Sequence, residues 1–263
     1  MSDAPTRSAV SITFSVWRAL LLREALTRLF GRRAAWFWLL LEPAFHAGFL
    51  MLLFAAVRVR HVGGFQTPMW VLLGLIAYFF FQRTSRQAAG AVRANYPFFA
   101  YRQVVPVDAV LSRAFLEGAL MVVVAVLLLL AAGFFGLRAW PADPLKVIFV
   151  ISGMWTCGLG FGLISSVVEE MSSELGLVLG MASRPLYLLS GVMFPLASLP
   201  PVFRDALMLN PLAHGVELLR LGFAPYYHAV PGVSVGYLHV WGLALTLCGL
   251  LLQLGFARRM ASE

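Results

Sequence analysis

Six apolar segments, each about as long as a membrane-crossing helix, dominate this chain of 263 residues. They cover about residues 34–57, 69–91, 107–136, 145–168, 175–194 and 233–256. An α-helix needs roughly 20 residues to cross the hydrocarbon core of a bilayer. Because 60% of the residues are hydrophobic and only 12% are charged, a soluble domain of this size could not bury its apolar surface. The sequence therefore predicts an all-α polytopic membrane protein with six transmembrane helices.

The positions of the charged residues predict how the chain is oriented. The net charge is +8, but the basic residues cluster in 2–33 and 83–113, between apolar segments. This pattern is typical of positive cytoplasmic loops and argues against nucleic-acid binding. An even number of spans puts both termini on one side of the membrane. We therefore predict a cytoplasmic N-terminus over 1–33, a transmembrane domain over 34–257 and a cytoplasmic C-terminus over 258–263.

An amphipathic helix is predicted before the first span. Apolar residues recur there at helical spacing, while polar residues occupy the other face. The apolar set is Leu22, Ala25, Leu26, Leu29 and Phe30, and the polar set includes Arg23, Glu24 and Arg28. Glu24 and Arg28 are spaced as an i,i+4 ion pair. We expect an interfacial helix lying at the membrane surface. The alternative is that this segment extends the first span into the cytoplasm.

The connection between the second and third spans is predicted to be a cytoplasmic coupling loop over about 92–107. It is long, rich in arginine and interrupted by Pro97 and Pro106, and Asp108 is placed to cap the next helix. Aromatic residues and Arg102 gather in it: Tyr96, Phe98, Phe99 and Tyr101. Such residues often anchor a protein partner. The alternative is an aromatic belt resting on the lipid interface.

A proline-interrupted apolar segment, about 195–232, precedes the last span. It is too broken for one span, so we expect two re-entrant helices on the periplasmic side. Four polar residues fall on one helical face there: Asn210, His214, Glu217 and Arg220. We expect this stripe to face a cavity, as part of a translocation path or gate. The alternative is a Glu217–Arg220 pair that acts as a structural strut.

Other ionisable residues lie inside or beside the predicted spans. Glu42 and His46 are one helical turn apart in the first span. A charge at such depth costs about 2.5–3.5 kcal/mol on insertion scales, so it should face a partner or water. We assign both residues to the path, with a local pair that sets helix packing as the alternative. Glu117 follows Arg113 by four residues, which favours a simple salt bridge on one helix.

The sequence carries no motif for catalysis or nucleotide binding. The histidines form no HExxH pattern, no GxSxG nucleophile motif occurs, and the two cysteines lie singly in apolar segments. A phosphate-binding loop needs lysine before Ser or Thr, whereas the only lysine, Lys146, precedes Val147. We predict a non-enzymatic transport subunit without its own cofactor or metal. Any ATP and Mg²⁺ would bind to a separate ATPase chain.

Six stretches together make the chain resemble the KpsM-type permeases of capsule polysaccharide ABC exporters, in the type-two ABC exporter superfamily. They are LLLRE (20–24), TRLFG (27–31), LEPAFH (41–46), YRQVVPVDAVLSRAFLE (101–117), RPLYLLSGVMFPLASLP (184–200) and NPLAHGVELLR (210–220). The resemblance implies a homodimer in the bacterial inner membrane with two copies of a cytoplasmic ABC ATPase. It also implies a periplasmic adaptor, an outer-membrane channel and a lipid-linked capsular polysaccharide as cargo.

For the residues, the resemblance implies a coupling helix near 94–105 that the ATPase moves. Arginine and histidine along the path suit an acidic polymer. Tyr187, Tyr226 and Tyr227 are expected to offer faces on which sugar rings stack and slide. Two alternatives stay open. A related permease would export O-antigen, a teichoic-type polymer or a drug, and a membrane-embedded transferase would use Glu42 and His46 on a lipid-linked sugar.

Overall fold

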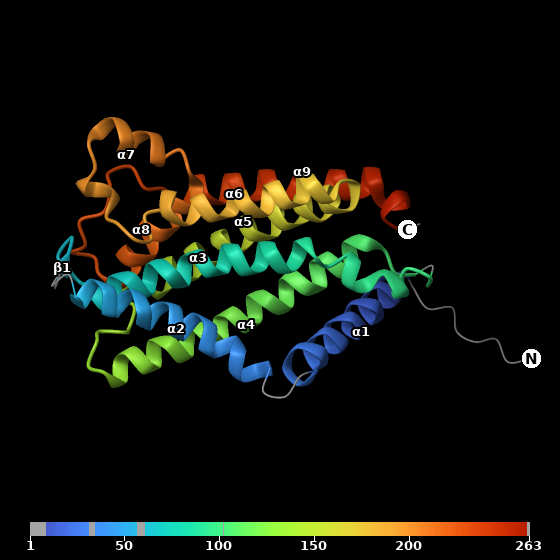
Figure 1. Cartoon of the computed structure of the whole chain (residues 1–263), viewed down its shortest axis with the longest axis horizontal. Helices are drawn as coiled ribbons and strands as arrows, with labels where there is room; N and C mark the ends of the chain where they lie inside the picture. Colours follow the sequence, from blue (N-terminus) through green and yellow to red (C-terminus); the bar gives the residue numbers. More distant parts are fainter. Residues whose placement is uncertain (1–8, 32–34, 57–60, 102, 262–263) are drawn as a thin grey trace, which may run out of the picture.

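A computed structural model describes residues 9–31, 35–56, 61–101 and 103–261, which fold into a bundle of long helices (Figure 1). The long helices are α1 (Ala9–Phe30), α2 (Ala35–Ala56), α3 (Thr67–Ala89), α4 (Pro106–Phe134), α5 (Pro144–Met171), α6 (Ser173–Leu189) and α9 (Val235–Ala261). Shorter elements connect them: β1 (His61–Val62), β2 (Phe65–Gln66), η1 (Arg93–Phe98), η2 (Leu196–Ser198), α7 (Pro201–Leu207) and α8 (Pro211–Phe223). β1 and β2 form an antiparallel pair.

Proline and a capping acceptor fix where several helices begin. Proline occupies one of the first two positions of α3, α4, α5, α7 and α8, where its missing N–H breaks no helical hydrogen bond. The Asp143 carboxylate accepts from the Lys146 N–H at 3.0 Å, and the Asn210 side chain accepts from the Leu212 N–H at 3.1 Å. Val105 is the N-cap of α4, and Asp108 lies in the first turn, where its carboxylate accepts from the Val105 N–H at 3.2 Å.

Four helices within the described residues are long and apolar enough to cross a membrane: α2, α4, α5 and α9. α6 has 17 residues, and α3 includes Gln82, Arg83 and Arg86 near its end. Large apolar side chains cover the outside of the bundle, among them Phe45, Leu130, Ile148 and Leu254. So much exposed apolar surface is stable only against lipid. The chain is a nearly all-helical, multi-pass membrane protein.

α3 forms the centre of the bundle. From Met69 to Phe81 each of its residues is buried, and it packs against α2, α4, α5 and α8. α5 in turn packs along α9, which lies beside it over most of its length (Figure 1). Glycines allow these close approaches. A Cβ atom at Gly162 would lie 2.4 Å from the Ala88 Cβ atom on α3, so only glycine permits this spacing.

The two ends of the bundle differ in the elements they bring together. The start of α1 and the end of α9 lie at one end of the molecule, while β1, α7 and α8 lie at the other (Figure 1). The expected pair of short helices before the last span is present as α7 and α8. α8 is buried along almost its whole length by α3, α5 and α9.

α1 is a separate helix, because it ends at Phe30 and α2 begins at Ala35. Its predicted apolar side is exposed, with Leu22, Leu26 and Phe30 more than half accessible. Its polar side is turned toward the protein instead, and Glu24 is buried. This arrangement suits a helix whose outer face contacts lipid and whose inner face contacts other charged groups.

The close contact between α5 and α9 depends on Gly160. A Cβ atom there would lie 2.5 Å from the Thr246 backbone nitrogen. We expect Gly160→Ala to destabilise the fold by about 1–3 kcal/mol, because backbone must shift to relieve the overlap. Thermal unfolding of the purified protein in detergent measures this. Gly255→Ala is the control, since a Cβ atom there meets nothing within 4 Å. Equal melting temperatures for the two variants would show that the packing is looser than described.

Candidate functional site

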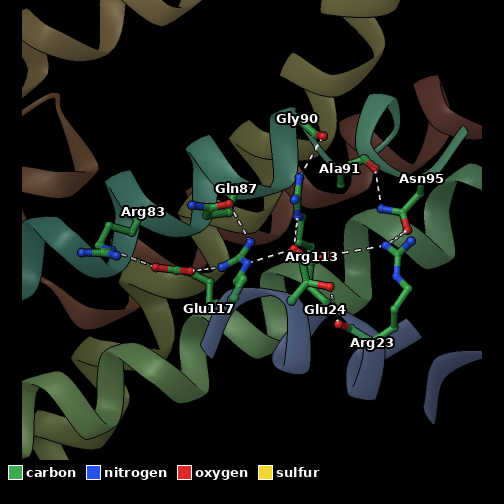
Figure 2. A network of polar contacts seen from close by, with 11 residues as sticks. Arg23, Glu24, Arg83, Gln87, Gly90, Ala91, Asn95, Arg113 and Glu117 are labelled. Atoms are coloured by element: carbon green, nitrogen blue, oxygen red, sulfur yellow. Dashed lines mark hydrogen bonds and ion pairs between the residues drawn. The ribbon is translucent and has the colours of Figure 1, made fainter. Parts of the chain in front are cut away.

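A network of arginines and carboxylates joins α1 to α3 and α4 (Figure 2). Glu24 lies at its α1 side and accepts from Arg28 Nε at 2.9 Å and from Arg113 Nε at 2.6 Å. Arg113 also donates to the Gly90 carbonyl at 2.9 Å. A single carboxylate on α1 therefore pairs with Arg28 and the more distant Arg23 of its own helix and with Arg113 of α4.

Glu117 on α4 is the second centre of this network. Its side chain is fully buried, accepts from Arg83 Nε of α3 at 2.8 Å and forms an ion pair with Arg28 of α1. Arg28 also donates to Gln87 on α3 at 2.6 Å. Because Arg28 binds both Glu24 and Glu117, the two carboxylates and three helices form one continuous cluster, as Figure 2 shows.

The same network reaches the connection between α3 and α4. Arg23 of α1 donates to the Asn95 side chain of η1 at 2.5 Å, and its guanidinium lies 4.2 Å from the centre of the Phe98 ring. Trp17 of α1 donates to Asp108 at the start of α4 at 2.8 Å. α1 therefore holds both η1 and the first turn of α4.

The network stabilises the ionised form of the Glu24 carboxyl, as the direction of its pKa shift indicates. Burial raises the pKa of its carboxyl. The guanidinium groups of Arg113 and Arg28 lower it by more than burial raises it, so the pKa lies below its ordinary value. Glu24 therefore stays ionised at neutral pH. Breaking one partner out of a buried ion pair typically costs about 3–5 kcal/mol, because the remaining charge is left uncompensated.

The coupling residues predicted from sequence have different environments. Tyr96 donates to Glu170 of α5 and packs edge-on against Phe99, so both rings are partly covered. Phe98 is also partly buried, beneath Arg23. Arg23 of α1 and Tyr96 of η1 therefore cover part of Phe98 and of Phe99, respectively. Tyr101 is 67% exposed. Arg102 lies outside the described residues.

The structure brings Glu42, His46 and Tyr187 together. They line a groove of about 860 Å³ between α2 and α6. His46 Nε2 lies 3.0 Å from the Tyr187 hydroxyl, and Arg83 lies 3.5 Å from Glu42. The Glu42 side chain is 70% exposed. The remaining lining residues are apolar or aromatic: Trp38, Leu41, Phe45, Phe49, Leu50 and Met193.

Glu217 and Arg220 form a second buried ion pair, at 3.0 Å on α8. Both side chains are fully buried, and Arg220 also donates to the carbonyls of Trp70 and Val192. Its guanidinium lies 3.6 Å from the Trp70 ring centre. Glu217 accepts from the Tyr227 hydroxyl at 3.1 Å. Among the described residues, protein groups surround both side chains, which is the geometry of the alternative, a structural strut.

The other residues of this region are placed around the ends of α8. Asn210 caps the helix and its amide donates to Ser190 at 3.0 Å. His214 accepts from the Ser234 N–H through Nδ1 at 3.0 Å, and its Nε2 lies 2.8 Å from the Met208 carbonyl oxygen. Tyr226 is 52% exposed and stands edge-on to Phe65. Tyr226 is thus the accessible member of the predicted pair of tyrosines, since Tyr227 is buried.

The comparisons with known proteins place this architecture in a family. Residues 15–224 match the model of the ABC-2 type transporter family. The chain belongs to this family. It is 35% identical to the polysialic acid transport protein KpsM of Escherichia coli over 246 residues, which cover 94% of this chain and 95% of that protein. The predicted resemblance to KpsM-type permeases is confirmed.

Two further relatives are named for capsule export. The capsule polysaccharide export inner-membrane protein BexB of Haemophilus influenzae is 26% identical, over 96% of this chain and 95% of its own length. The corresponding protein CtrC of Neisseria meningitidis is 28% identical, over 78% of this chain and 77% of its own length. This permease is therefore a membrane transport subunit of the ABC-2 type.

Sequence reasoning missed how the charges of this permease pair. Arg113 and Glu117 were expected to bind each other on one helix, but Arg113 binds Glu24, and Glu117 binds Arg28 and Arg83. The expected Glu24–Arg28 pair is confirmed. A signal was available, because an apolar chain that carries several arginines and few acids at matching membrane depth must share the acids among them.

Glu117 is the residue of this permease on which we expect the network to depend most. Glu117→Gln removes the charge that two arginines share, so we expect a loss of about 3–5 kcal/mol of stability. Thermal unfolding of the purified protein is the measurement. Glu174→Gln on the exposed first turn of α6 is the matched control and should leave the melting temperature unchanged. If the Glu117→Gln protein has the same melting temperature as the control, a structural role for the network is refuted.

Proposed function

We propose that this chain is the permease subunit of an ATP-driven exporter that moves lipid-linked capsular polysaccharide across the bacterial inner membrane. The observation that carries the proposal is the 35% identity to a polysialic acid transport protein, which extends over 94% of the chain. Relatives named for capsule polysaccharide export support the same class of cargo. An acidic polymer suits the positive charge of the chain, +8 at neutral pH.

The proposed topology has six spans: α2, α3, α4, α5, α6 and α9. We count α3 and α6 as spans, in addition to the four apolar helices, because they pack within the same bundle. α1 then lies in the cytoplasmic interface, both termini are cytoplasmic, and α7 and α8 are re-entrant helices on the periplasmic side. The arginines near η1 and α1 support this orientation, since basic residues are retained in the cytoplasm.

The proposed assembly is a homodimer of this chain with two copies of a cytoplasmic ABC ATPase. ATP and Mg²⁺ bind to the ATPase, and this chain supplies the path. A periplasmic adaptor and an outer-membrane channel then carry the polymer onward. Large apolar side chains are exposed on both α2 and α6, and a second copy or lipid would cover them.

In this proposal the ATPase docks beside Tyr101. A groove of about 500 Å³ lies between α1 and residues 98–101 and 103–104, and Tyr101 lines it with two thirds of its surface exposed. Val16, Ala19 and Leu20 of α1 line the opposite side. A partner that fills this groove would contact α1 and the coupling segment together and would therefore move both.

Arg83 provides the connection from the coupling end to the path. It binds Glu117 at 2.8 Å within the network and lies 3.5 Å from Glu42 in the groove between α2 and α6. A shift of α1 or η1 displaces Arg28 and Glu117, and Arg83 then redistributes its contacts between the two carboxylates. Movement at the ATPase thereby changes the charge that faces the groove.

The groove between α2 and α6 is the proposed beginning of the path. Its aromatic side chains offer flat apolar faces on which sugar rings can stack without fixing one register. His46 and Tyr187 supply hydrogen-bonding groups for sugar hydroxyls. At the periplasmic end, the buried Glu217–Arg220 strut holds α8 rigid, and Tyr226 presents an accessible ring.

Inactivating the gene in its own host tests the function. We expect finished capsular polymer to accumulate inside the cell and to disappear from the surface, and a plasmid copy should restore it. An unaltered surface coat would reject the capsule assignment and leave O-antigen, teichoic-type polymer or drug export. Absence of polymer both inside and outside would support a transferase acting on a lipid-linked sugar instead.

We expect Tyr101→Ala to leave the protein folded but to weaken the binding of the partner ATPase or the stimulation of its ATP hydrolysis. Removing an exposed aromatic anchor typically costs about 1–4 kcal/mol of binding, so we expect at least a fivefold loss of affinity or of stimulated ATP hydrolysis. Co-purification and ATPase rates in nanodiscs measure this. Trp140→Ala is the matched control, because Trp140 is exposed in the connection between α4 and α5. Unchanged ATPase rates with Tyr101→Ala would remove this residue from the docking site.

Arg83→Lys separates coupling from folding. Lysine keeps the charge but has one ammonium group, which cannot hold Glu117 and Glu42 together as the guanidinium does. We expect ATPase binding to persist while transport per ATP falls about tenfold, within the usual range of coupling energies. Arg18→Lys on the exposed side of α1 is the control. A parallel fall in melting temperature and ATPase rate would instead identify Arg83 as a purely structural residue.

A further inference from the structure

A third cavity lies between α3, α5 and α6, apart from the groove at Glu42 and the groove at Tyr101. Its volume is about 610 Å³, and α3 lines it from Gln82 to Ala89. These residues are on the same part of α3 as Arg83 and Gln87 of the network. The cavity is therefore at the level of the membrane where the proposed topology puts the cytoplasmic lipid headgroups.

The wall of this cavity is basic. Arg86 of α3, Arg93 of η1 and Arg184 of α6 line it, against one carboxylate, Glu169. Arg93 is bound to Glu170 at 3.1 Å and to the Glu169 carbonyl at 2.6 Å. Among the described residues, no ion pair is found for Arg86 or Arg184. Two guanidinium groups from different helices are thus available to an anion in the same cavity.

A buried hydroxyl on the wall of this cavity has no hydrogen-bond partner among the described residues. Ser165 of α5 lines the cavity, is 4% exposed, and its Oγ atom has no hydrogen-bond partner among the described residues. A buried polar group without a partner is costly, so such groups commonly mark a bound ligand or ion. An anion held by Arg86 and Arg184 would accept the Ser165 hydroxyl proton as a hydrogen bond.

The rim of the cavity is apolar where α6 passes it. Leu177 and Met181 line the cavity and are 64% and 59% exposed. Gly180 lies between them, and a Cβ atom there would meet nothing within 4 Å. A ligand that matches both parts has an anionic head and a hydrocarbon tail. Free inorganic phosphate would bind the arginines of the wall but would make no apolar contact with the rim.

We propose that this cavity binds the phosphate headgroup of a lipid, and that it receives the lipid anchor of the cargo. The phosphate lies between Arg86 and Arg184 and accepts from Ser165, because guanidinium groups bind phosphate oxygens in charge-assisted hydrogen bonds. The acyl chain runs along Leu177 and Met181. The headgroup site follows from the cavity itself, whereas its role for cargo rests on the proposed function.

Native mass spectrometry of the full-length purified permease tests the headgroup site. The probe is phosphatidylglycerol, with phosphatidylcholine and inorganic phosphate for comparison. We expect the wild type to retain phosphatidylglycerol, and the Arg86→Ala, Arg184→Ala double variant to retain at least about tenfold less, since each lost charge-assisted bond weakens binding. Inorganic phosphate should not displace the lipid. Equal retention by the double variant, or displacement by phosphate, would overturn the proposal.

Two matched variants control for charge and for folding. The Arg18→Ala, Arg204→Ala double variant loses the same charge outside the cavity and should retain phosphatidylglycerol as the wild type does. Gly180→Leu fills the open space without changing charge and should lower retention as the arginine variant does. If the charge control also loses phosphatidylglycerol, or if Gly180→Leu retains it fully, the lipid is held by nonspecific attraction to positive charge and not by this cavity.

The role for cargo is measured separately, as surface polysaccharide in cells that carry each variant. We expect the Arg86→Ala, Arg184→Ala variant to hold polymer inside the cell while the charge control exports it. Full export by a variant that has lost lipid would overturn the cargo role and leave the headgroup site. Failure of the gene-inactivation test would reject the exporter itself without altering the lipid measurement.

Discussion

The compensation of buried charge is the constraint on which this structure depends. In a chain that is mostly apolar, an arginine between helices must meet an acceptor, because an uncompensated charge there costs several kcal/mol. Glu24 and Glu117 are the carboxylates that meet this need where α1 lies against α3 and α4. Their shared arginines fix α1 against α3 and α4. The position of η1, the exposure of Tyr101 and the contact of Arg83 with Glu42 all follow from that attachment.

Much of the helical framework could be predicted from the sequence. The six apolar segments lie on the helices α2, α3, α4, α5, α6 and α9, since hydrophobic length directly reflects what a bilayer requires. Interactions at helix starts are equally local. The Asp108 carboxylate accepts from the Val105 N–H in the first turn of α4, and the Ser172 hydroxyl accepts from the Leu175 N–H at 3.4 Å at the start of α6. In each case the interaction joins residues that are close in the sequence.

The partners of the polar side chains could not be predicted in the same way. Spacing along one helix identifies i,i+4 neighbours, and it correctly paired Glu24 with Arg28, but it also paired Arg113 with Glu117. The choice between these depends on which helix packs alongside. The stripe on α8 had the same ambiguity, because a polar face avoids lipid equally well by facing a cavity or by facing protein. The ring that covers Arg220 belongs to Trp70, a residue of an apolar segment that has no polar pattern of its own.

The inward-facing polar side of α1 has a consequence for biosynthesis. Its partners Gln87, Arg113 and Glu117 belong to α3 and α4, which leave the ribosome after α1. Until α4 is in place, Glu24 has only Arg28 of its own helix and Arg23 beside it as counter-charges. α1 must therefore wait at the membrane surface with its polar side in water. α1 thus docks only after α4 has been synthesised, and the charged interface that joins α1 to α3 and α4 forms late in the assembly of the permease.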